Sequence, residues 1–262
     1  MKLATFLAPG ASEPQAGEVR DGEVVAFRSG TVLDRLVSGD RTPADGPSHL
    51  LESVVLLAPI PRPPAIFCVG RNYAAHIEEL KNERPERPLV FLKLPRSSAP
   101  PGGPVIRPAV TNALDYETEL VLVMGRDDEI AGYAVANDLS ARDLQRTEKQ
   151  WTRAKGFDTS CPWGPWITTA DEIADPRDLR ITTHVNGEPR QDASTAELIF
   201  GPRELVDFIA ETCTLEPGAL ILTGTPGGVG EALDPPRYLQ PGDEVRCEIS
   251  ALGALVHTVT SA

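Results

Sequence analysis

Residues 115–125, DYETELVLVMG, combine an unbroken apolar run with a cluster of acids. The five consecutive apolar residues 120–124 predict a buried β-strand. Acids stand at its mouth, at Asp115, Glu117 and Glu119, and the segment holds no lysine or arginine. Because burying an unpaired charge is costly, these acids need a metal ion, a basic residue from elsewhere in the chain, or solvent.

The rest of the chain is rich in turn-forming residues. Its 25 prolines and 22 glycines indicate many turns and short strands rather than a helical bundle. Helices are expected over 72–82, 140–154 (begun by a Ser140 cap) and 203–213, TVLDRLV could be a short helix or a strand, and the helices do not alternate regularly with strands. The pattern therefore favours an α+β, mainly β fold with mostly antiparallel sheets over a Rossmann sheet or a TIM barrel.

A proline-rich segment, PIPRPPA at 59–65, reads as a stiff connector. The residues before it are weakly patterned, whereas the strand signals strengthen after it. We therefore expect a small N-terminal β-rich domain over 1–60 and the main domain over 61–262.

Charge and composition limit the classes of function. The net charge of −13 argues against nucleic acids and anionic membranes as partners, and it suits a soluble protein that binds a divalent cation. No apolar run is long enough to span a bilayer, and the first residues do not read as a signal peptide. The four cysteines are widely spaced and form no CxxC motif, which indicates reduced thiols in a cytoplasmic protein.

Strand geometry predicts where the acids meet. Side chains alternate along a strand, so Glu117 and Glu119 share a face. If ELVLVMG and IAGYAVAN form a hairpin across the short turn RDDE, Asp138 lies beside Glu117. Three oxygen ligands without a histidine or thiol suit Mg²⁺, Mn²⁺ or Ca²⁺ rather than zinc. In the alternative interpretation, both glutamates face water and Asp138 caps the next helix.

Three further features have both a functional and an ordinary interpretation. His76 and Glu79 share a face of the expected helix, either as a general base and the carboxylate that orients it or as a surface ion pair. Lys155 suits an active site or a solvated helix end. The segment GTPGGVG at 224–230 could approach a small anion or simply turn the chain, since it matches no phosphate-loop motif. Without GxSxG, a serine nucleophile has no local support.

Taken together, these segments resemble the fumarylacetoacetate hydrolase family. The resemblance covers about residues 65–262 and lies in GRNYAAHIEE, PLVFLK, DYETELVLVMG, GYAVANDLSARDLQ, WTRAKGFDTSCPWGPWI, VNGEPRQ, LTGTPGGVG and LQPGDEVRCEI. It implies a mixed β-sandwich roll with a metal at its mouth, assembled as a homodimer. Here RDDEIA is shorter than the link that relatives often have between the VMG and GY strands, which concerns pocket shape and subunit contacts more than metal binding.

The resemblance also implies roles for particular residues. Mg²⁺, or else Mn²⁺ or Ca²⁺, would be the cofactor. The metal ligands would be Glu117, Glu119 and Asp138. The catalytic residues would be His76, Glu79 and Lys155. The residues that contact a small 2-oxo acid substrate would be Arg71, Tyr73, Arg142, Gln145 and Thr225.

The implied reaction is hydrolysis of a carbon–carbon bond in an acylpyruvate-like 2-oxo acid, through a metal-stabilised enolate, as in aromatic catabolism. The His76–Glu79 pair favours this reaction because hydrolysis needs an activated water. The same site suits a decarboxylase or an isomerase of oxaloacetate-like or 2-hydroxydiene dioate substrates. A third reading is a ligand-binding relative without activity, which the joint presence of these site residues disfavours.

Overall fold

The structure, a computed structural model that describes residues 1–262, is built around the expected hairpin. β11 (Thr118–Met124) pairs antiparallel with β12 (Ile130–Asn137). A β-bulge near the turn shifts the register by one residue, and the Asp138 N–H donates to the carbonyl of Glu117 at 2.8 Å. The predicted proximity of Glu117 and Asp138 is confirmed.

The apolar run of β11 is unbroken because the strand is covered on both faces. Leu120 and Leu122 pack in the larger hydrophobic core, which also contains residues of the second sheet. Val121 and Val123 pack in a separate core on the opposite face. Alternation along the strand sends successive side chains into these two cores, so every residue of β11 is buried.

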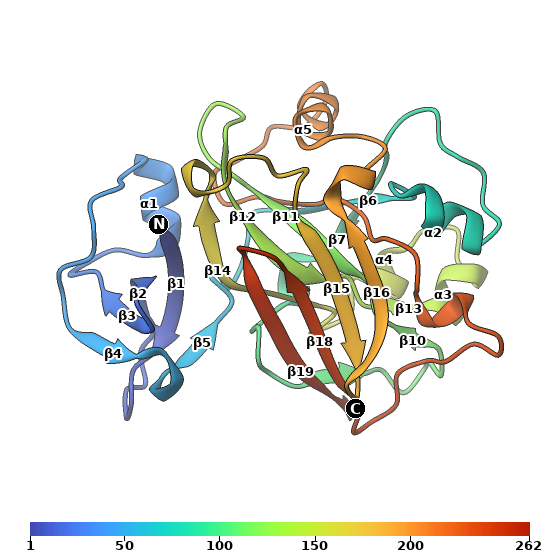
Figure 1. Cartoon of the computed structure of the whole chain (residues 1–262), viewed down its shortest axis with the longest axis horizontal. Coiled ribbons are helices and arrows are strands. Elements are labelled where there is room, and N and C mark those ends of the chain that lie inside the picture. Colours follow the sequence, from blue (N-terminus) through green and yellow to red (C-terminus); the bar gives the residue numbers. More distant parts are fainter.

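Two large sheets and one small sheet make up the mainly β fold, which confirms the expected class (Figure 1). The twelve-stranded sheet has the order β4-β3-β2-β1-β14-β12-β11-β17-β6-β7, with β5 beside β1 and β8 beside β14. Its other strands are β1 (Lys2–Leu7), β2 (Gln15–Arg20), β3 (Glu23–Ala26), β4 (Ser48–Leu50), β5 (Val55–Leu57), β6 (Ile66–Gly70), β7 (Leu89–Lys93), β8 (Ser98–Ala99), β14 (Cys161–Thr169) and β17 (Leu220–Leu222).

The second sheet has five strands in the order β16-β15-β18-β19-β9 and packs against the larger one. Its strands are β9 (Val105–Arg107), β15 (Arg180–Val185), β16 (Glu188–Ser194), β18 (Glu244–Ile249) and β19 (Gly253–Ser261). The small sheet pairs β10 (Leu114–Asp115) with β13 (Ser140–Ala141).

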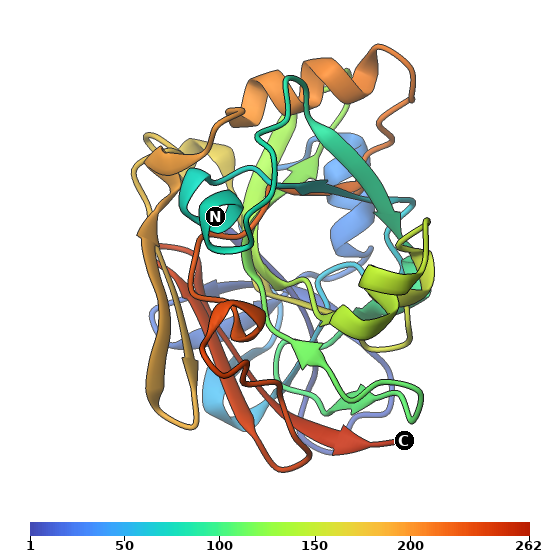
Figure 2. The ribbon, with the colours of Figure 1, turned by 90° about the vertical axis from the view of Figure 1, so that its right-hand side faces the viewer.

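Short helices lie at the periphery of these sheets. In Figure 2 the end of the molecule that carries α2 and α3 faces the viewer, and α5 crosses the top. The α-helices are α1 (Val32–Ser38), α2 (Ala74–Glu79), α3 (Arg142–Thr147), α4 (Thr152–Lys155) and α5 (Pro202–Ala210). The 3₁₀ turns are η1 (Leu51–Ser53), η2 (Pro95–Ser97), η3 (Ala170–Glu172), η4 (Thr195–Glu197) and η5 (Gly230–Ala232).

The single helix expected over 140–154 is wrong. The segment forms two helices, α3 and α4, because Glu148 adopts an extended conformation between them. Ser140 does not cap a helix, since it belongs to β13 and its hydroxyl donates to the carbonyl of Asp138 at 3.1 Å. A hairpin turn at VNGE joins β15 to β16: Asn186 and Gly187 both have positive φ, at 52° and 77°.

The N-terminal residues extend the large sheet. β1 pairs with β14, and side chains of α1 share a core with β11 and β14. Backbone pairing thus crosses the proposed boundary at residue 60, and the division into 1–60 and 61–262 stays a proposal. All four cysteines are free, and no helix is both long and apolar enough to cross a bilayer.

Candidate functional site

A polar cavity of about 380 Å³ opens where β6, β11 and β12 meet α2, α3 and α4. Only four of the 17 residues around it are hydrophobic, so it suits a small polar ligand. The residues that line it and enter the argument below are Arg71, His76, Phe91, Glu117, Glu119, Asp138, Arg142, Gln145, Arg146, Lys155, Thr225 and Glu231.

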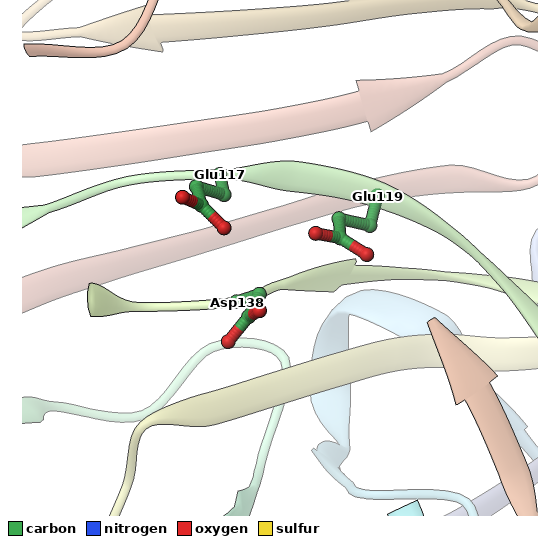
Figure 3. Close-up of side chains that lie close together, drawn as sticks. All are labelled: Glu117, Glu119 and Asp138. Atoms are coloured by element: carbon green, nitrogen blue, oxygen red, sulfur yellow. The ribbon is translucent and has the colours of Figure 1, made fainter. Parts of the chain in front are cut away.

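Three carboxylates converge at the base of this cavity. Glu117 and Glu119 extend from the β11 segment towards Asp138, which follows β12 (Figure 3). One oxygen from each lies within 4.8 Å of the others, and the three residues are at most 4 % exposed. The alternative in which the glutamates face water is therefore excluded. Three buried carboxylate oxygens are a donor set that fits Mg²⁺, Mn²⁺ or Ca²⁺.

Cations from distant parts of the chain balance two of these acids. Lys155 Nζ lies 2.6 Å from Glu117 Oε2 and 2.8 Å from Asp138 Oδ2. Lys93 Nζ lies 2.6 Å from the other oxygen of Asp138, and Arg142 pairs with Glu117 at 2.7 Å. Lys155 ends α4 but is only 2 % exposed, so it is not a solvated helix end.

Glu119 has no such cation. Its only hydrogen bond comes from the Gly224 N–H at 2.7 Å. Burial, together with the charges of Asp138 and Glu117, raises the pKa of Glu119 well above its ordinary value. At Glu117, burial also acts to raise the pKa, but Lys155 and Arg142 outweigh it and lower the pKa to about 2. The triad thus has one carboxylate without a positive partner, which fits a site that receives a cation.

His76 and Glu79 form the predicted pair. His76 Nδ1 lies 2.8 Å from Glu79 Oε1, and His76 is 7 % exposed and lines the cavity. The second Glu79 oxygen accepts from the Gly228 N–H at 2.7 Å. With Nδ1 held by Glu79, Nε2 is the ring atom left to exchange a proton with a ligand. This burial and orientation favour the general-base interpretation over a surface ion pair.

The glycine-rich segment 224–230 serves the protein's own acids. Its amides at Gly224, Gly228 and Gly230 donate to Glu119, Glu79 and Asp115, respectively. Gly228 has φ 103° and packs so closely that a β-carbon would lie 2.1 Å from the Arg190 carbonyl. The segment is therefore more than a simple turn. Its three amides are not available to an external anion, because they bind the protein's own carboxylates.

The residues expected to contact substrate divide into three groups. Arg71, Gln145 and Thr225 line the cavity. Arg142 also lines it, but its guanidinium is committed to Asp115, Glu117 and Gln145.

Tyr73 is different: it is fully buried, does not line the cavity, and its hydroxyl has no hydrogen-bond partner. A direct contact of Tyr73 with substrate stays a prediction, and in this structure the side chain is buried outside the cavity lining.

Arg71 is the cation of the cavity wall that the protein leaves free. It forms no ion pair with the chain, unlike Arg142, Arg146 and Lys155. Its φ of 58° places a non-glycine residue in the left-handed region directly after β6. Such a conformation carries an energetic cost and is concentrated at ligand sites.

Two buried residues of the site were missed from the sequence. The first is Lys93, which shares a face of β7 with Phe91 of the cavity wall because the two occupy alternate positions. A lysine at the end of an otherwise apolar strand was the signal in the sequence. Asp115 was noticed only as an acid of the opening segment. It accepts hydrogen bonds from Arg142 Nε at 2.8 Å and from the N–H groups of Gly230 and Glu231. Asp115 thus fixes the guanidinium of Arg142 in place.

Comparison with known proteins points in the same direction. A family model described as fumarylacetoacetate (FAA) hydrolase C-terminal matches residues 65–260. Oxaloacetate tautomerase Fahd2a, mitochondrial, of Rattus norvegicus is 37% identical over 286 aligned positions, which cover 99% of this chain and 91% of that protein.

Two solved structures are similar along the whole chain. The fumarylacetoacetate hydrolase from psychrophilic Exiguobacterium antarcticum has a TM-score of 0.90 and 36% identity, with both chains covered completely. The 2-hydroxyhepta-2,4-diene-1,7-dioate isomerase from Mycobacterium marinum has a TM-score of 0.83 and 35% identity, with 100% of this chain and 98% of that chain covered.

Proposed function

The chain belongs to the fumarylacetoacetate hydrolase family, and we propose that it acts as a divalent-metal-dependent isomerase that interconverts the enol and keto forms of a small 2-oxo dicarboxylate such as oxaloacetate. The observation that carries this proposal is the placing of the His76–Glu79 pair and the acidic triad in one small polar cavity. Enolisation needs both a proton-transfer group and stabilisation of negative charge on the carbonyl oxygen.

Glu117, Glu119 and Asp138 would hold the ion, and the free carboxylate of Glu119 supports the fit. When bound, a divalent ion supplies Lewis-acid polarisation of the substrate carbonyl. Proton transfer and the other charge stabilisation are assigned to side chains of the protein. His76 holds or releases a proton at Nε2, and Glu79 keeps its ring oriented. Lys155, at the edge of the triad, adds positive charge near the enolate oxygen.

Arg71 would bind the second carboxylate of the substrate. Its guanidinium is uncommitted and lines the cavity. A guanidinium suits a carboxylate because it donates two parallel hydrogen bonds. This assignment favours dicarboxylates over monocarboxylates.

The relatives favour isomerisation over the carbon–carbon hydrolysis that the sequence first suggested. The similar rat protein is named a tautomerase, and the Mycobacterium marinum structure is named an isomerase. Both reactions begin with proton transfer at a carbon beside a carbonyl, which the His76–Glu79 pair suits. Hydrolysis of an acylpyruvate remains the second candidate, because a structure named as a fumarylacetoacetate hydrolase matches with a TM-score of 0.90.

The test follows three signals from one preparation of the protein. Enol oxaloacetate is added with Mg²⁺, and the loss of enol absorbance is measured against a blank of Mg²⁺ without protein. Pyruvate is assayed in the same sample, and acetylpyruvate cleavage in a parallel one. We expect the enol absorbance to fall faster than in the blank, without an equivalent release of pyruvate and without cleavage of acetylpyruvate. Pyruvate release alone would make the protein a decarboxylase, and cleavage alone would make it a hydrolase.

The proposed assembly and location are independent of this test. A homodimer and a cytoplasmic location stay predictions, which size measurements in solution and localisation of the native protein can check.

A further inference from the structure

Gln191 lies behind the cavity, on β16 of the second sheet. It is 1% exposed and does not line the cavity, so it cannot contact a ligand. Its amide joins two parts of the site. It reaches Thr118, which stands between Glu117 and Glu119, and it reaches Thr225, which lines the cavity.

The orientation of this amide is set by partners that can play only one role. The Thr118 N–H can only donate, and it points to Gln191 Oε1 at 3.1 Å. The Pro226 carbonyl can only accept, and it faces Gln191 Nε2 at 2.8 Å. The oxygen and nitrogen of the amide are therefore distinguished by chemistry. The Thr183 hydroxyl donates to the same Oε1 at 2.6 Å.

This orientation decides how the Thr225 hydroxyl can bond. Gln191 Nε2 donates to Thr225 Oγ1 at 2.8 Å, so Thr225 is the acceptor in that contact. No protein group accepts the hydroxyl proton of Thr225. Because Thr225 lines the cavity, its proton is available there to an oxygen of a ligand.

We propose that Gln191 is a positioning residue, which orients the Thr225 hydroxyl as a hydrogen-bond donor to an anionic oxygen in the cavity. The inference rests on the proposed function only in that the ligand is an anionic 2-oxo acid. Through Thr118, the same amide ties the loop that carries Thr225 to the start of β11, next to Glu117 and Glu119. One buried side chain thus connects the donor to the segment that carries the two glutamates.

The experiment measures binding of oxalate to the Mg²⁺-saturated protein by calorimetry, so it does not depend on turnover. Gln191→Met removes the amide, and Thr225→Val removes the hydroxyl. Each should raise the dissociation constant by roughly 10- to 100-fold, the loss expected for one hydrogen bond to a charged group. The double variant should bind no worse than the weaker single variant, because both changes remove the same contact.

The matched control is Thr183→Val, which breaks a hydrogen bond on the other side of the same amide. It should lower stability without changing the oxalate dissociation constant by more than about twofold. Should Gln191→Met fail to fold, Gln191→Glu keeps the shape and replaces the donors beside Thr225 by an acceptor, with the same loss of affinity expected.

Two results would overturn the proposal. One is additive losses in the double variant. The other is an equal loss in Thr183→Val, which would show a general structural effect. If oxalate binding behaves as expected but enol oxaloacetate is not converted, the proposed reaction fails while the role of Gln191 stands.

Discussion

The ammonium group of Lys93 lies 2.6 Å from Oδ1 of Asp138, and both side chains are buried. Lys155 contacts the other oxygen of the same carboxylate at 2.8 Å. Asp138 is thus held between two lysines that come from β7 and α4. Lys93 does not line the cavity, so it balances the charge of Asp138 from the protein interior, while Lys155 lines the cavity.

Replacement of Lys93 by methionine tests this arrangement. Lys93→Met leaves a buried carboxylate with one cation fewer, and we expect the free energy of unfolding to fall by about 3 kcal/mol, the low end for a broken buried pair, because Lys155 remains. Urea denaturation in EDTA measures it. The control Arg180→Met breaks the exposed pair with Asp192 and should cost far less. Equal stabilities for wild type and Lys93→Met would show that Asp138 does not depend on Lys93.

Acid should weaken the fold through Glu117. The pKa of this carboxyl is lowered from 4.5 to about 2 in the folded protein, so the unfolded chain takes up the proton first as the pH falls. The stabilisation from Glu117 is complete above pH 4.5 and is lost as the pH falls towards 2. Denaturation curves across this range should show a steeper loss for wild type than for Glu117→Gln; parallel curves would contradict the assignment.

Proton transfer is assigned to His76. His76→Asn should lower kcat for enol oxaloacetate by roughly 10²- to 10⁴-fold, the usual contribution of a general acid–base group. Its affinity for Mn²⁺, measured by calorimetry, should stay within about twofold of wild type because His76 is not among the proposed ligands. His184→Asn, on β15, is the matched control and should keep its activity. Near wild-type turnover in His76→Asn would remove the pair from the mechanism.

Selectivity for a second carboxylate is assigned to Arg71. Arg71→Met keeps a β-carbon, so the backbone cost of the left-handed conformation is unchanged. The KM for oxaloacetate should rise by roughly 10- to 100-fold as a charged hydrogen bond is lost. Binding of oxalate, which matches only the carboxylate and 2-oxo oxygens of the substrate and has no distal carboxylate for Arg71, should not change. Equal losses for both ligands would place Arg71 elsewhere in the pocket.

Local rules predicted that the three acids could meet but left open whether they face water, and the family resemblance chose between these readings. Alternation puts Glu117 and Glu119 on one face, and a short hairpin turn brings Asp138 opposite. The His76–Glu79 pair likewise follows from helical spacing. The burial of β11 was also predicted from its unbroken apolar run, and the structure adds that two separate cores cover its faces.

The partners of these acids could not be predicted, since they depend on packing between distant segments. Lys93 precedes Asp138 by 45 residues, and Gln191, on β16 of the second sheet, lies 34 residues before Thr225, which follows β17. Contacts between residues so far apart in the chain produce no periodic pattern that could be recognised in the sequence. The interrupted helix at Glu148 was missed for a related reason, because the segment has helix-forming composition while its tertiary contacts place Lys155 at the triad.

The central claim is that Glu117, Glu119 and Asp138 hold a divalent cation, and calorimetric titration of Mn²⁺ into EDTA-stripped protein tests it most directly. Wild type should bind one ion per chain, and Glu119→Gln should bind it at least roughly tenfold more weakly. The variant Glu78→Gln, changed at an exposed position of α2, should match wild type. No binding by wild type, or equal affinity in Glu119→Gln, would contradict the account.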